Sequence, residues 1–466
     1  MHLPLPSLPA LSPHRSALCA SRLALTPLLS TLSCLLLLSL AQAEETWPQF
    51  RGPQSSGTST NTQLPDTWSS TQNVEWKTDL PGRSWSSPIT WNNQIFLTAV
   101  INTGESEPPK KGLYFGGNRP EPPKSTHITK AYGLDLKTGN INWETTLHEG
   151  QPQTAIHLKS SYGAETPITD GTNVYALFGG LGVYALTLNG ELVWSHPLPP
   201  RPVRYGWGYS SSPTLHNGQL IIVNDNDEQS EILSLNTQTG KELWRTPRDE
   251  KSNWASPFIW NNTQRTEVIT CGTQAVRSYN LKGELLWSLQ GMSSIVIPTP
   301  VSTPNLLFVS SGYVGDKHRP VYAIKPGATG NISLAPDTTS NAHIAWSHPT
   351  AAPYNPSPVL YENRLYILLD RGLVSCFNAQ TGEQLYDRER LPNGYAFTSS
   401  PWAHNGKIFC LNEDGRCFVL QAGDTFNILH VNELSDDDMC MATPALAGDR
   451  LLIRTSTRIY SIRNPQ

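Results

Sequence analysis

Charged residues are scarce in this chain of 466 residues. Asp, Glu, Lys and Arg together make up 15% of it, and its 34 Lys and Arg residues form no cluster. A protein that binds nucleic acid concentrates basic residues on one face, because each contact has to neutralise a phosphate. We therefore expect no nucleic acid among its partners.

Cysteine is also sparse, and no cysteines are adjacent. Seven are present, of which five lie beyond residue 43: Cys271, Cys376, Cys410, Cys417 and Cys440. An odd, scattered set is not a disulfide framework, and without Cys-x-x-Cys or His-x-x-x-His spacing we expect no zinc site and no haem attachment. Cys410 and Cys417 flank a turn at Asn412–Gly415. A disulfide across that hairpin and two buried thiols both remain open.

Long apolar runs are confined to the N-terminus. Residues 1–43 begin with basic residues, continue through an apolar run from Leu23 to Leu40, and end in Ala41-Gln42-Ala43. This order predicts a secretory signal peptide, and hence export to the periplasm or the cell surface with no membrane span after cleavage. Residues 44–70 then form an N-terminal segment. An uncut anchor and a lipoprotein at Cys34 are the alternatives.

Glycine, proline and tryptophan are plentiful, with 34, 38 and 14 residues, and no segment shows sustained helical periodicity. This composition is typical of a turn-rich β protein. Within Ser210–Trp244, turns rich in Gly, Asn and Asp separate short β-prone runs, which predicts a four-stranded antiparallel meander. The four runs are Ser211–Leu215, Gln219–Asn224, Glu231–Asn236 and Lys241–Arg245.

The meander is repeated along the chain. A proline preceded by small or hydroxyl residues recurs eight times, at Pro88, Pro167, Pro213, Pro257, Pro300, Pro358, Pro401 and Pro444. Five of the seven intervals are 43 to 46 residues, the length of one propeller blade. We read Ile101–Lys130 and Gly327–Asn341 as insertions in the two longer intervals. The sequence thus predicts an all-β, eight-bladed propeller of four-stranded antiparallel blades over residues 71–466.

An aromatic residue marks the outer strand of most units: Trp76, Trp143, Trp194, Trp244, Trp287, Trp346 and Tyr386. Trp76 precedes the first anchor, whereas Pro444 is followed by only three strands' worth of chain. The last of the eight units gains its fourth strand if Val74–Leu80 pairs with the strand near Arg458–Ile462. Such a clasp removes an open sheet edge.

The ends of several units match the pattern Ala-x-Asp-x-x-Thr-Gly-x-x-x-Trp, as at Asp135, Thr138, Gly139 and Trp143. From about residue 68 onward the chain resembles the pyrroloquinoline-quinone (PQQ) repeat family, which includes quinoprotein alcohol dehydrogenases and BamB. Trp47–Pro53 resembles the N-terminal segment of secreted members. We expect Asp or Asn to cap the turn, Thr to bond the turn backbone, Gly to adopt positive φ, and Trp to pack on the next blade. The motif therefore indicates a fold, and function has to be argued separately.

The resemblance implies two different functions. PQQ-dependent dehydrogenases clamp the quinone against adjacent cysteines and hold Ca²⁺, and this chain has no such cysteine pair. We therefore expect no cofactor, no metal and no catalytic residue, with PQQ and Ca²⁺ only under the dehydrogenase alternative. Two acidic runs, Asp225–Glu228 and Asp436–Asp438, are interpreted as solvated turns in preference to calcium ligands.

The segments that precede the innermost strands rim the channel of a propeller, a common binding place. Here they carry aromatic residues and nearby arginines, the composition of a recognition surface. The candidate binding residues are Arg83, Trp85, Tyr162, Arg204, Trp207, Tyr209, Trp254, Tyr354, Tyr395 and Phe397. The competing interpretation is that these rings only wedge the blades together. We expect a BamB-like, non-catalytic scaffold for a protein or peptide of the cell envelope, with a carbohydrate-binding propeller as a further alternative.

Overall fold

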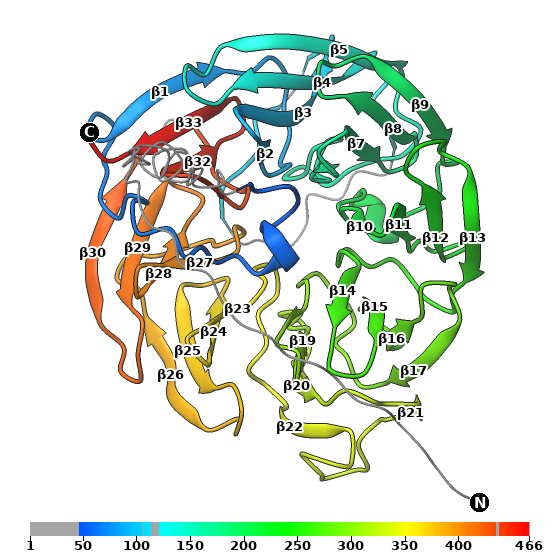
Figure 1. Cartoon of the computed structure of the whole chain (residues 1–466), viewed down its shortest axis with the longest axis vertical. Helices are drawn as coiled ribbons and strands as arrows, with labels where there is room; N and C mark the ends of the chain where they lie inside the picture. The colour runs from blue at the N-terminus through cyan, green and yellow to red at the C-terminus, as the bar shows by residue number, and fades with distance from the viewer. Residues whose placement is uncertain (1–45, 106, 113–120, 435–437, 466) are drawn as a thin grey trace, which may run out of the picture. The chain divides into compact units, whose positions relative to one another are not determined.

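Eight small sheets follow one another around a ring in the computed structural model (Figure 1). The structure describes residues 46–105, 107–112, 121–434 and 438–465, so the predicted signal peptide lies outside the described residues. Each sheet is a blade with four antiparallel strands, and in seven of the eight blades the strand that comes first in the sequence lies innermost. The predicted fold class is therefore confirmed. Over the described residues, no helix is long and apolar enough to cross a membrane.

The strands fall into blades as follows. Blade 1 comprises β2 (Ile89–Trp91), β3 (Gln94–Asn102), β4 (His127–Asp135) and β5 (Ile141–Gly150), and blade 2 comprises β6 (Ile168–Thr169), β7 (Asn173–Phe178), β8 (Gly182–Thr187) and β9 (Leu192–Pro197). Blade 3 comprises β10 (Thr214–His216), β11 (Gln219–Asn224), β12 (Glu231–Asn236) and β13 (Glu242–Pro247), and blade 4 comprises β14 (Phe258–Asn261), β15 (Thr266–Thr270), β16 (Val276–Tyr279) and β17 (Leu285–Leu289). Blade 5 comprises β18 (Val301–Ser302), β19 (Leu307–Ser310), β20 (Val321–Ile324) and β22 (Ile344–His348), and blade 6 comprises β23 (Val359–Tyr361), β24 (Arg364–Leu369), β25 (Leu373–Asn378) and β26 (Gln384–Arg390). Blade 7 comprises β27 (Trp402–His404), β28 (Lys407–Leu411), β29 (Arg416–Gln421) and β30 (Ile428–Glu433), and blade 8 comprises β31 (Ala445–Ala447), β32 (Arg450–Arg454), β33 (Arg458–Arg463) and β1 (Val74–Asp79). The remaining elements are the 3₁₀ turns η1 (Pro53–Ser55) and η2 (Arg204–Gly206), and β21 (Gly330–Asn331).

The ring closes as predicted, through β1 at the outer edge of blade 8. Lys77 pairs with Tyr460 and Asp79 with Arg458 in antiparallel register. The Glu75 carboxylate accepts hydrogen bonds from Arg450 Nε at 2.7 Å and from Arg463 Nη1 at 3.1 Å. The N-terminal strand is thereby tied to the C-terminal blade by both a ladder and an ion-pair network.

The meander from which the repeat was recognised is blade 3. Its two middle strands, β11 and β12, have the predicted bounds. The innermost strand β10 begins at Thr214, three residues later than expected, because Ser211–Pro213 still belongs to the segment that borders the channel. The outer strand β13 runs two residues further than expected.

Neighbouring blades are held by contacts between a tryptophan of one outer strand and a glycine of the next blade, the packing role expected of the motif. Gly240, at φ +67°, lies against the Trp194 ring so closely that a Cβ would sit 2.6 Å from it. The Trp194 indole also donates to the carbonyl of Thr237 at 2.9 Å. The same arrangement recurs at Trp76 with Gly139, Trp143 with Gly190, Trp244 with Gly283, and Trp346 with Gly382.

The two insertions differ from their predicted outlines. Strand β3 ends at Asn102 and strand β4 begins at His127. The first insertion is therefore shorter than the predicted Ile101–Lys130. Within the second, β21 pairs in parallel with β17, the outer strand of blade 4, and makes that blade five-stranded. The predicted polar extension thus adds a strand to the preceding blade.

All five cysteines beyond the predicted leader are buried and free, so the disulfide alternative for Cys410 and Cys417 is wrong. Cys410 pairs with Phe418, and Cys417 pairs with Leu411, one position along the ladder. Because neighbouring positions of a strand point to opposite faces, the two thiols enter different hydrophobic clusters.

The N-terminal segment around η1 crosses the centre of the ring (Figure 1). Trp47 N donates to the carbonyl of Thr90 in blade 1, and the buried Arg51 donates through Nη2 to the carbonyl of Pro358 in blade 6 at 2.6 Å. Further along, Thr58 bridges to Ala403 in blade 7. The segment therefore links distant blades across the axis and limits the depth of the central channel.

Candidate functional site

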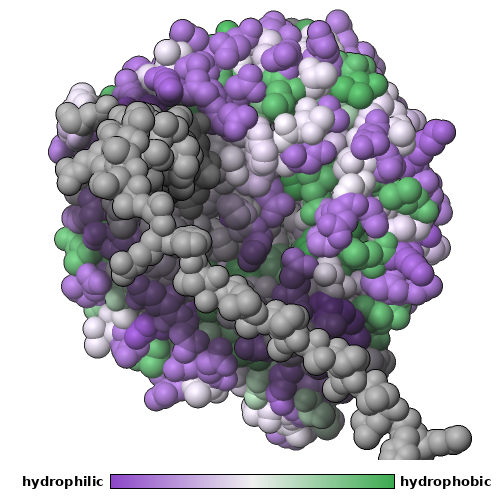
Figure 2. Space-filling model, viewed as in Figure 1, coloured by the Kyte–Doolittle hydropathy of each residue, from purple (hydrophilic) through white to green (hydrophobic). Residues whose placement is uncertain are grey.

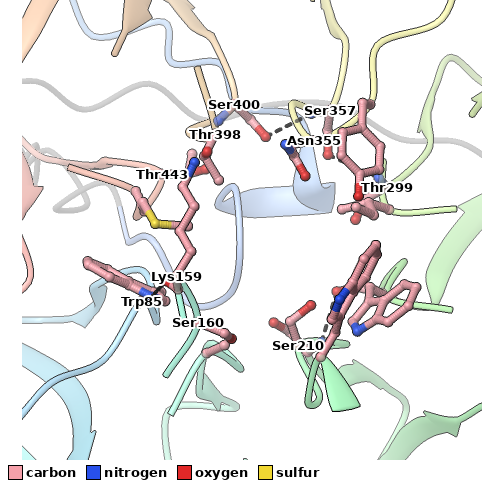
Figure 3. Close-up of a pocket in the computed structure, with 18 of the residues that line it drawn as sticks. Trp85, Lys159, Ser160, Ser210, Thr299, Asn355, Ser357, Thr398, Ser400 and Thr443 are labelled. Atoms are coloured by element: carbon pink, nitrogen blue, oxygen red, sulfur yellow. Dashed lines mark hydrogen bonds between the residues drawn. The ribbon is translucent and has the colours of Figure 1, made fainter. Parts of the chain in front are cut away.

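A cavity of about 450 Å³ occupies the channel at the centre of the ring. Its walls are the segments that lead into the innermost strands, which all eight blades supply (Figure 3). Phe50, from the segment that crosses the axis, contributes to the lining. Propellers place binding sites at this position, and the volume falls in the range of ordinary ligand pockets.

A ring of hydroxyl groups surrounds the cavity. In every blade the residue before the anchor proline is serine or threonine, and all eight line the cavity: Ser87, Thr166, Ser212, Ser256, Thr299, Ser357, Ser400 and Thr443. The ring is bonded around its circumference, because the backbone N–H of one blade donates to the hydroxyl oxygen of the next. Six such bonds of 2.9 to 3.0 Å join successive members.

These bonds use the hydroxyl oxygens as acceptors and leave their protons available. Among the described residues, the hydroxyls of Ser212, Ser256, Ser357 and Ser400 donate no hydrogen bond to the protein. A hydroxyl carries one proton that rotates to suit its partner. The ring therefore offers several O–H donors to whatever enters the cavity.

One wall is a series of aromatic rings. The Trp207 and Trp254 rings lie 5.6 Å apart, and Tyr205 lies 5.1 Å from Trp207 on its other side. Tyr205 is 57% exposed and has φ +56°, a left-handed conformation that is uncommon for a residue with a side chain. Exposure of the ring and the unfavourable backbone together make Tyr205 a candidate recognition residue. The series runs from the surface into the cavity.

A buried carboxylate fixes the next part of the same wall, where Tyr313 and Tyr354 pack in one cluster with Trp207 and Trp254. Tyr354 lies 5.3 Å from Tyr313, edge to face, and both line the cavity. Asp370 Oδ2 accepts the backbone N–H of Tyr354 at 3.0 Å, while its Oδ1 accepts that of Asn355 at 2.9 Å. Burial raises the pKa of Asp370 to about 6, although these N–H donors favour its charged form. Asp370 positions this wall without entering it.

Lys159 is the charged side chain among the lining residues, and its charge is already matched. Its ammonium forms an ion pair with the fully buried Glu413 and donates to the carbonyl of Gly112 at 2.9 Å. Glu413 also accepts from Thr398 Oγ1 at 2.6 Å. Figure 3 shows Lys159 extending toward Thr398. The cavity wall is consequently close to electrically neutral.

The structure brings five of the ten predicted binding residues to this cavity: Trp85, Trp207, Tyr209, Trp254 and Tyr354. Arg83 and Tyr162 line a neighbouring cavity of about 870 Å³ beside the first insertion. Arg204 is turned away and donates to the carbonyl of Ser294 at 2.6 Å. Tyr395 is 64% exposed outside these cavities.

Phe397 does not lie on the rim, contrary to the prediction. It is fully buried, and its ring lies 6.1 Å from that of Phe418 in the hydrophobic cluster of blades 6 and 7. For this residue the wedge interpretation holds. Its neighbour Thr398 lines the cavity instead, because successive residues of an extended segment point in opposite directions.

Sequence reasoning missed Lys159, Tyr205, Tyr313 and the hydroxyl ring as site residues. The ring had a signal, since a hydroxyl residue precedes every anchor proline. Lys159, Tyr205 and Tyr313 lie on loops outside the repeated pattern, so no periodicity marks them.

The acidic runs are not simply solvated turns. Asp225 is fully buried and forms a two-point ion pair with Arg248, through Nε at 2.8 Å and Nη2 at 3.0 Å. Asp438 is also buried and accepts from Thr455 and Thr457. Asp436 and Asp437 lie outside the described residues. Over the described part of the chain, no three His, Cys, Asp or Glu side chains gather as a metal-binding group.

The outer edge of blade 2 is a second candidate surface. Five of the eight outer strands carry Asp, Glu, Lys or Arg, whereas β9, β17 and β22 carry none. The edge of β17 is covered by β21, and β22 has no exposed residue. By contrast, β9 exposes Leu192 at 55% and Val193 at 46%. In Figure 2, hydrophobic residues reach the surface at separate points around the ring.

The family model of the outer membrane protein assembly factor BamB matches this chain over residues 58–206 and 203–422. The two matches span most of the propeller. The chain belongs to this BamB family. The match agrees with the resemblance that the repeat pattern indicated.

The solved structures that are similar to this BamB-family chain have low sequence identity to it. The quinohemoprotein alcohol dehydrogenase of Comamonas testosteroni is 11% identical with a TM-score of 0.56, over 92% of this chain and 83% of that one. The enzyme ADHIIG of Pseudomonas putida HK5 is also 11% identical, with a TM-score of 0.52 over 90% and 80%. BamB of Moraxella catarrhalis is 13% identical with a TM-score of 0.41, over 84% and 99%. No curated protein sequence matches the chain.

Proposed function

We propose that the chain is an exported, non-catalytic propeller that acts as a binding and scaffolding module for a protein of the cell envelope. The observation that carries this proposal is the open, uncharged edge of β9 in blade 2. The description of its family, an outer membrane protein assembly factor, supports a protein partner. Export follows from the signal peptide predicted at residues 1–43.

Proteins normally protect the edges of their sheets with charge or with a covering segment, because an exposed edge pairs with other chains. Here charge protects five of the outer strands, and β21 covers β17. The β21 pairing also demonstrates that a short extended segment adds to the outside of a blade in this molecule. Strand addition gives affinity through backbone hydrogen bonds, with the exposed Leu192 and Val193 adding apolar contact.

The test compares two matched positions on neighbouring blades. Val193 and Leu243 each directly precede the outer tryptophan of their strand, but β13 carries Glu242 and Arg245 whereas β9 carries no charge. We expect a photocrosslinking residue at position 193, and not at 243, to capture an extended segment of one envelope protein. Binding of that purified protein should fall at least tenfold for Val193→Lys and stay unchanged for Leu243→Lys. Equal crosslinking at both positions contradicts the proposal.

A PQQ-dependent dehydrogenase is the competing function. The cavity offers little to an anionic quinone, since Lys159 is already paired with Glu413 and the remaining lining is neutral. A carboxylate that enters such a wall loses its hydration without gaining a counter-charge. Adding PQQ and Ca²⁺ and recording the quinone absorbance together with dye-linked alcohol oxidation separates the two functions. Quinone binding with turnover overturns the non-catalytic assignment.

A further inference from the structure

We infer that the central cavity is a saccharide-binding site, which takes the neutral end group of a glycan of the cell envelope. The inference rests on the proposed non-catalytic function, but it needs no protein partner at β9. Three properties of the cavity lead to it: its hydrogen-bond donors, its aromatic faces and its lack of unpaired charge.

The donors come from the hydroxyl ring. At Ser212, Ser256, Ser357 and Ser400 the oxygen already accepts a backbone N–H, so the hydroxyl proton is the group left to bond a ligand. Asn355 also lines the cavity, but its side-chain Nδ2 already donates to Asp370 Oδ1 at 2.8 Å, so the serine hydroxyls are the main donors. When the cavity holds water, these protons are solvated, and a ligand that displaces the water has to replace those bonds. A pyranose does so, because it presents hydroxyl oxygens on several sides of one small ring.

The aromatic faces complement the other side of such a ligand. The indole N–H groups of Trp85 and Trp254 are engaged by the carbonyls of Lys159 and Gly208, at 2.9 and 2.7 Å. What these two indoles offer to a ligand is therefore their ring faces and edges. An aromatic face carries a partial negative charge, and the C–H groups on one side of a pyranose carry a partial positive charge. Tyr205 and Trp207 extend the same surface outward, where a second sugar unit of the glycan would pack.

Charge decides between a neutral and an acidic or basic sugar. Lys159 is held against the wall by Glu413 and the carbonyl of Gly112, and Thr398 donates to the same Glu413 carboxylate. Breaking that buried ion pair to bind a carboxylate would leave Glu413 buried and unpaired, which is strongly unfavourable. A protonated amine would find no free carboxylate among the described lining residues. A neutral sugar disturbs none of these contacts.

The position of the N-terminal segment explains why an end group is bound. Phe50 lines the cavity, and the segment around it contacts blades 1, 6 and 7 across the axis. A glycan chain is thereby prevented from threading through the ring. Its terminal unit enters the cavity, and the preceding unit lies against the exposed Tyr205.

The probe is an array of neutral, acidic and amino oligosaccharides, followed by calorimetry with the best neutral binder. We expect Tyr205→Ala and Trp207→Ala each to weaken binding at least tenfold. Thr299→Val should weaken saccharide binding about fivefold, because this change removes one hydroxyl of the hydroxyl ring. The backbone N–H of residue 299, which donates to Ser357, is kept. Tyr395→Ala is the matched aromatic control outside the cavity, and it should bind as the unchanged protein does. Circular dichroism spectra confirm that each variant is folded.

The outcomes separate this inference from the proposed function. Binding of neutral saccharides that is lost in the cavity variants and retained in Val193→Lys supports both. An array on which no neutral saccharide binds, or binding that Tyr205→Ala and Thr299→Val leave unchanged, overturns the saccharide site alone. Preferential capture of uncharged peptides on a parallel peptide array also overturns it. Chemical turnover of a bound saccharide would instead overturn the non-catalytic function.

Discussion

At the scale of single residues, His404 is a histidine that burial keeps neutral. It is fully buried in β27, its ring lies 4.3 Å from that of Phe409, and neither ring nitrogen has a hydrogen-bond partner among the described residues. Burial, with the nearby charge of Lys407, lowers its pKa to about 4 from the ordinary value of 6.5. In the unfolded chain the same ring accepts a proton below pH 6.5.

His404 therefore makes the protein less stable as the pH falls from 6.5 to 4, because only the unfolded state binds the proton in that interval. We expect the free energy of unfolding to drop by about 3 kcal/mol across this window from His404. His404→Phe should flatten this dependence of stability on pH, because phenylalanine takes up no proton. The substitution removes no hydrogen bond among the described residues, since neither ring nitrogen of His404 makes one. Urea denaturation at pH 7 and pH 4.5 measures it. An unchanged slope in the variant shows that another group is responsible.

Glu165 has the opposite dependence. It lies between the cavity residues Ala164 and Thr166, and its buried carboxyl accepts the N–H of Gly179 at 2.8 Å. Burial raises its pKa to about 7 from 4.5, so the unfolded chain loses the proton first and stability falls as the pH rises between these values. Glu165→Gln keeps an acceptor for Gly179.

The free energy of unfolding of the Glu165→Gln variant should exceed that of the unchanged protein by about 3 kcal/mol at pH 8, and by much less at pH 4.5. Thermal unfolding at both values tests the expectation. A gain of the same size at both would mean that the carboxyl charge is not the cause.

At the scale of elements, the contact between glycine and tryptophan holds one blade to the next. Gly218 and Gly240 are two glycines of blade 3 with similar φ, +74° and +67°. A Cβ on Gly240 would lie 2.6 Å from the Trp194 ring, whereas on Gly218 its nearest neighbour would be 3.8 Å away. The pair separates the cost of backbone strain from the cost of steric overlap.

Gly218→Ala should lower the free energy of unfolding by about 1 to 2 kcal/mol, the cost of a left-handed alanine. Gly240→Ala should lower it by about 3 to 4 kcal/mol, because the overlap with Trp194 adds to the strain. Chemical denaturation of both variants provides the comparison. Equal decreases in the free energy of unfolding would show that Trp194 moves aside at little cost and that its contact with Gly240 does not hold the blades together.

How far the sequence predicts an element depends on whether the repeat fixes it. Strands β11 and β12 were predicted to the residue, because each is a short apolar run with a turn rich in Gly, Asn or Asp at either end. The rim was predicted less well. Phe397 and Thr398 are adjacent, yet one enters the core and the other the cavity. Which of them faces the channel depends on the path of an irregular loop, and no period of two or 3.6 constrains that path.

At the scale of the whole molecule, the ring has two kinds of surface, to which we assign the two proposed partners. The central cavity is neutral, aromatic and lined with hydroxyls, whereas the perimeter consists of strand edges that are charged except at a few blades. A scaffold has to hold two partners without competition between them. The cavity is lined by the segments that lead into the innermost strands, whereas β9 lies at the perimeter of the ring (Figure 1), so one partner at each would not overlap the other.

Closure of the ring is the property that all eight blades share, and β1 provides it. Without β1, the outer side of β33 in blade 8 becomes an open edge, and Arg450 and Arg463 lose their carboxylate partner Glu75. A chain that begins at Thr71 keeps β1, whereas a chain that begins at Pro81 lacks it, and both lack the segment that crosses the axis. We expect the shorter chain to unfold at a temperature at least 5 °C lower, and to aggregate through the exposed edge. Calorimetry and light scattering on the two chains make the comparison, and equal unfolding temperatures would contradict a closing role for β1.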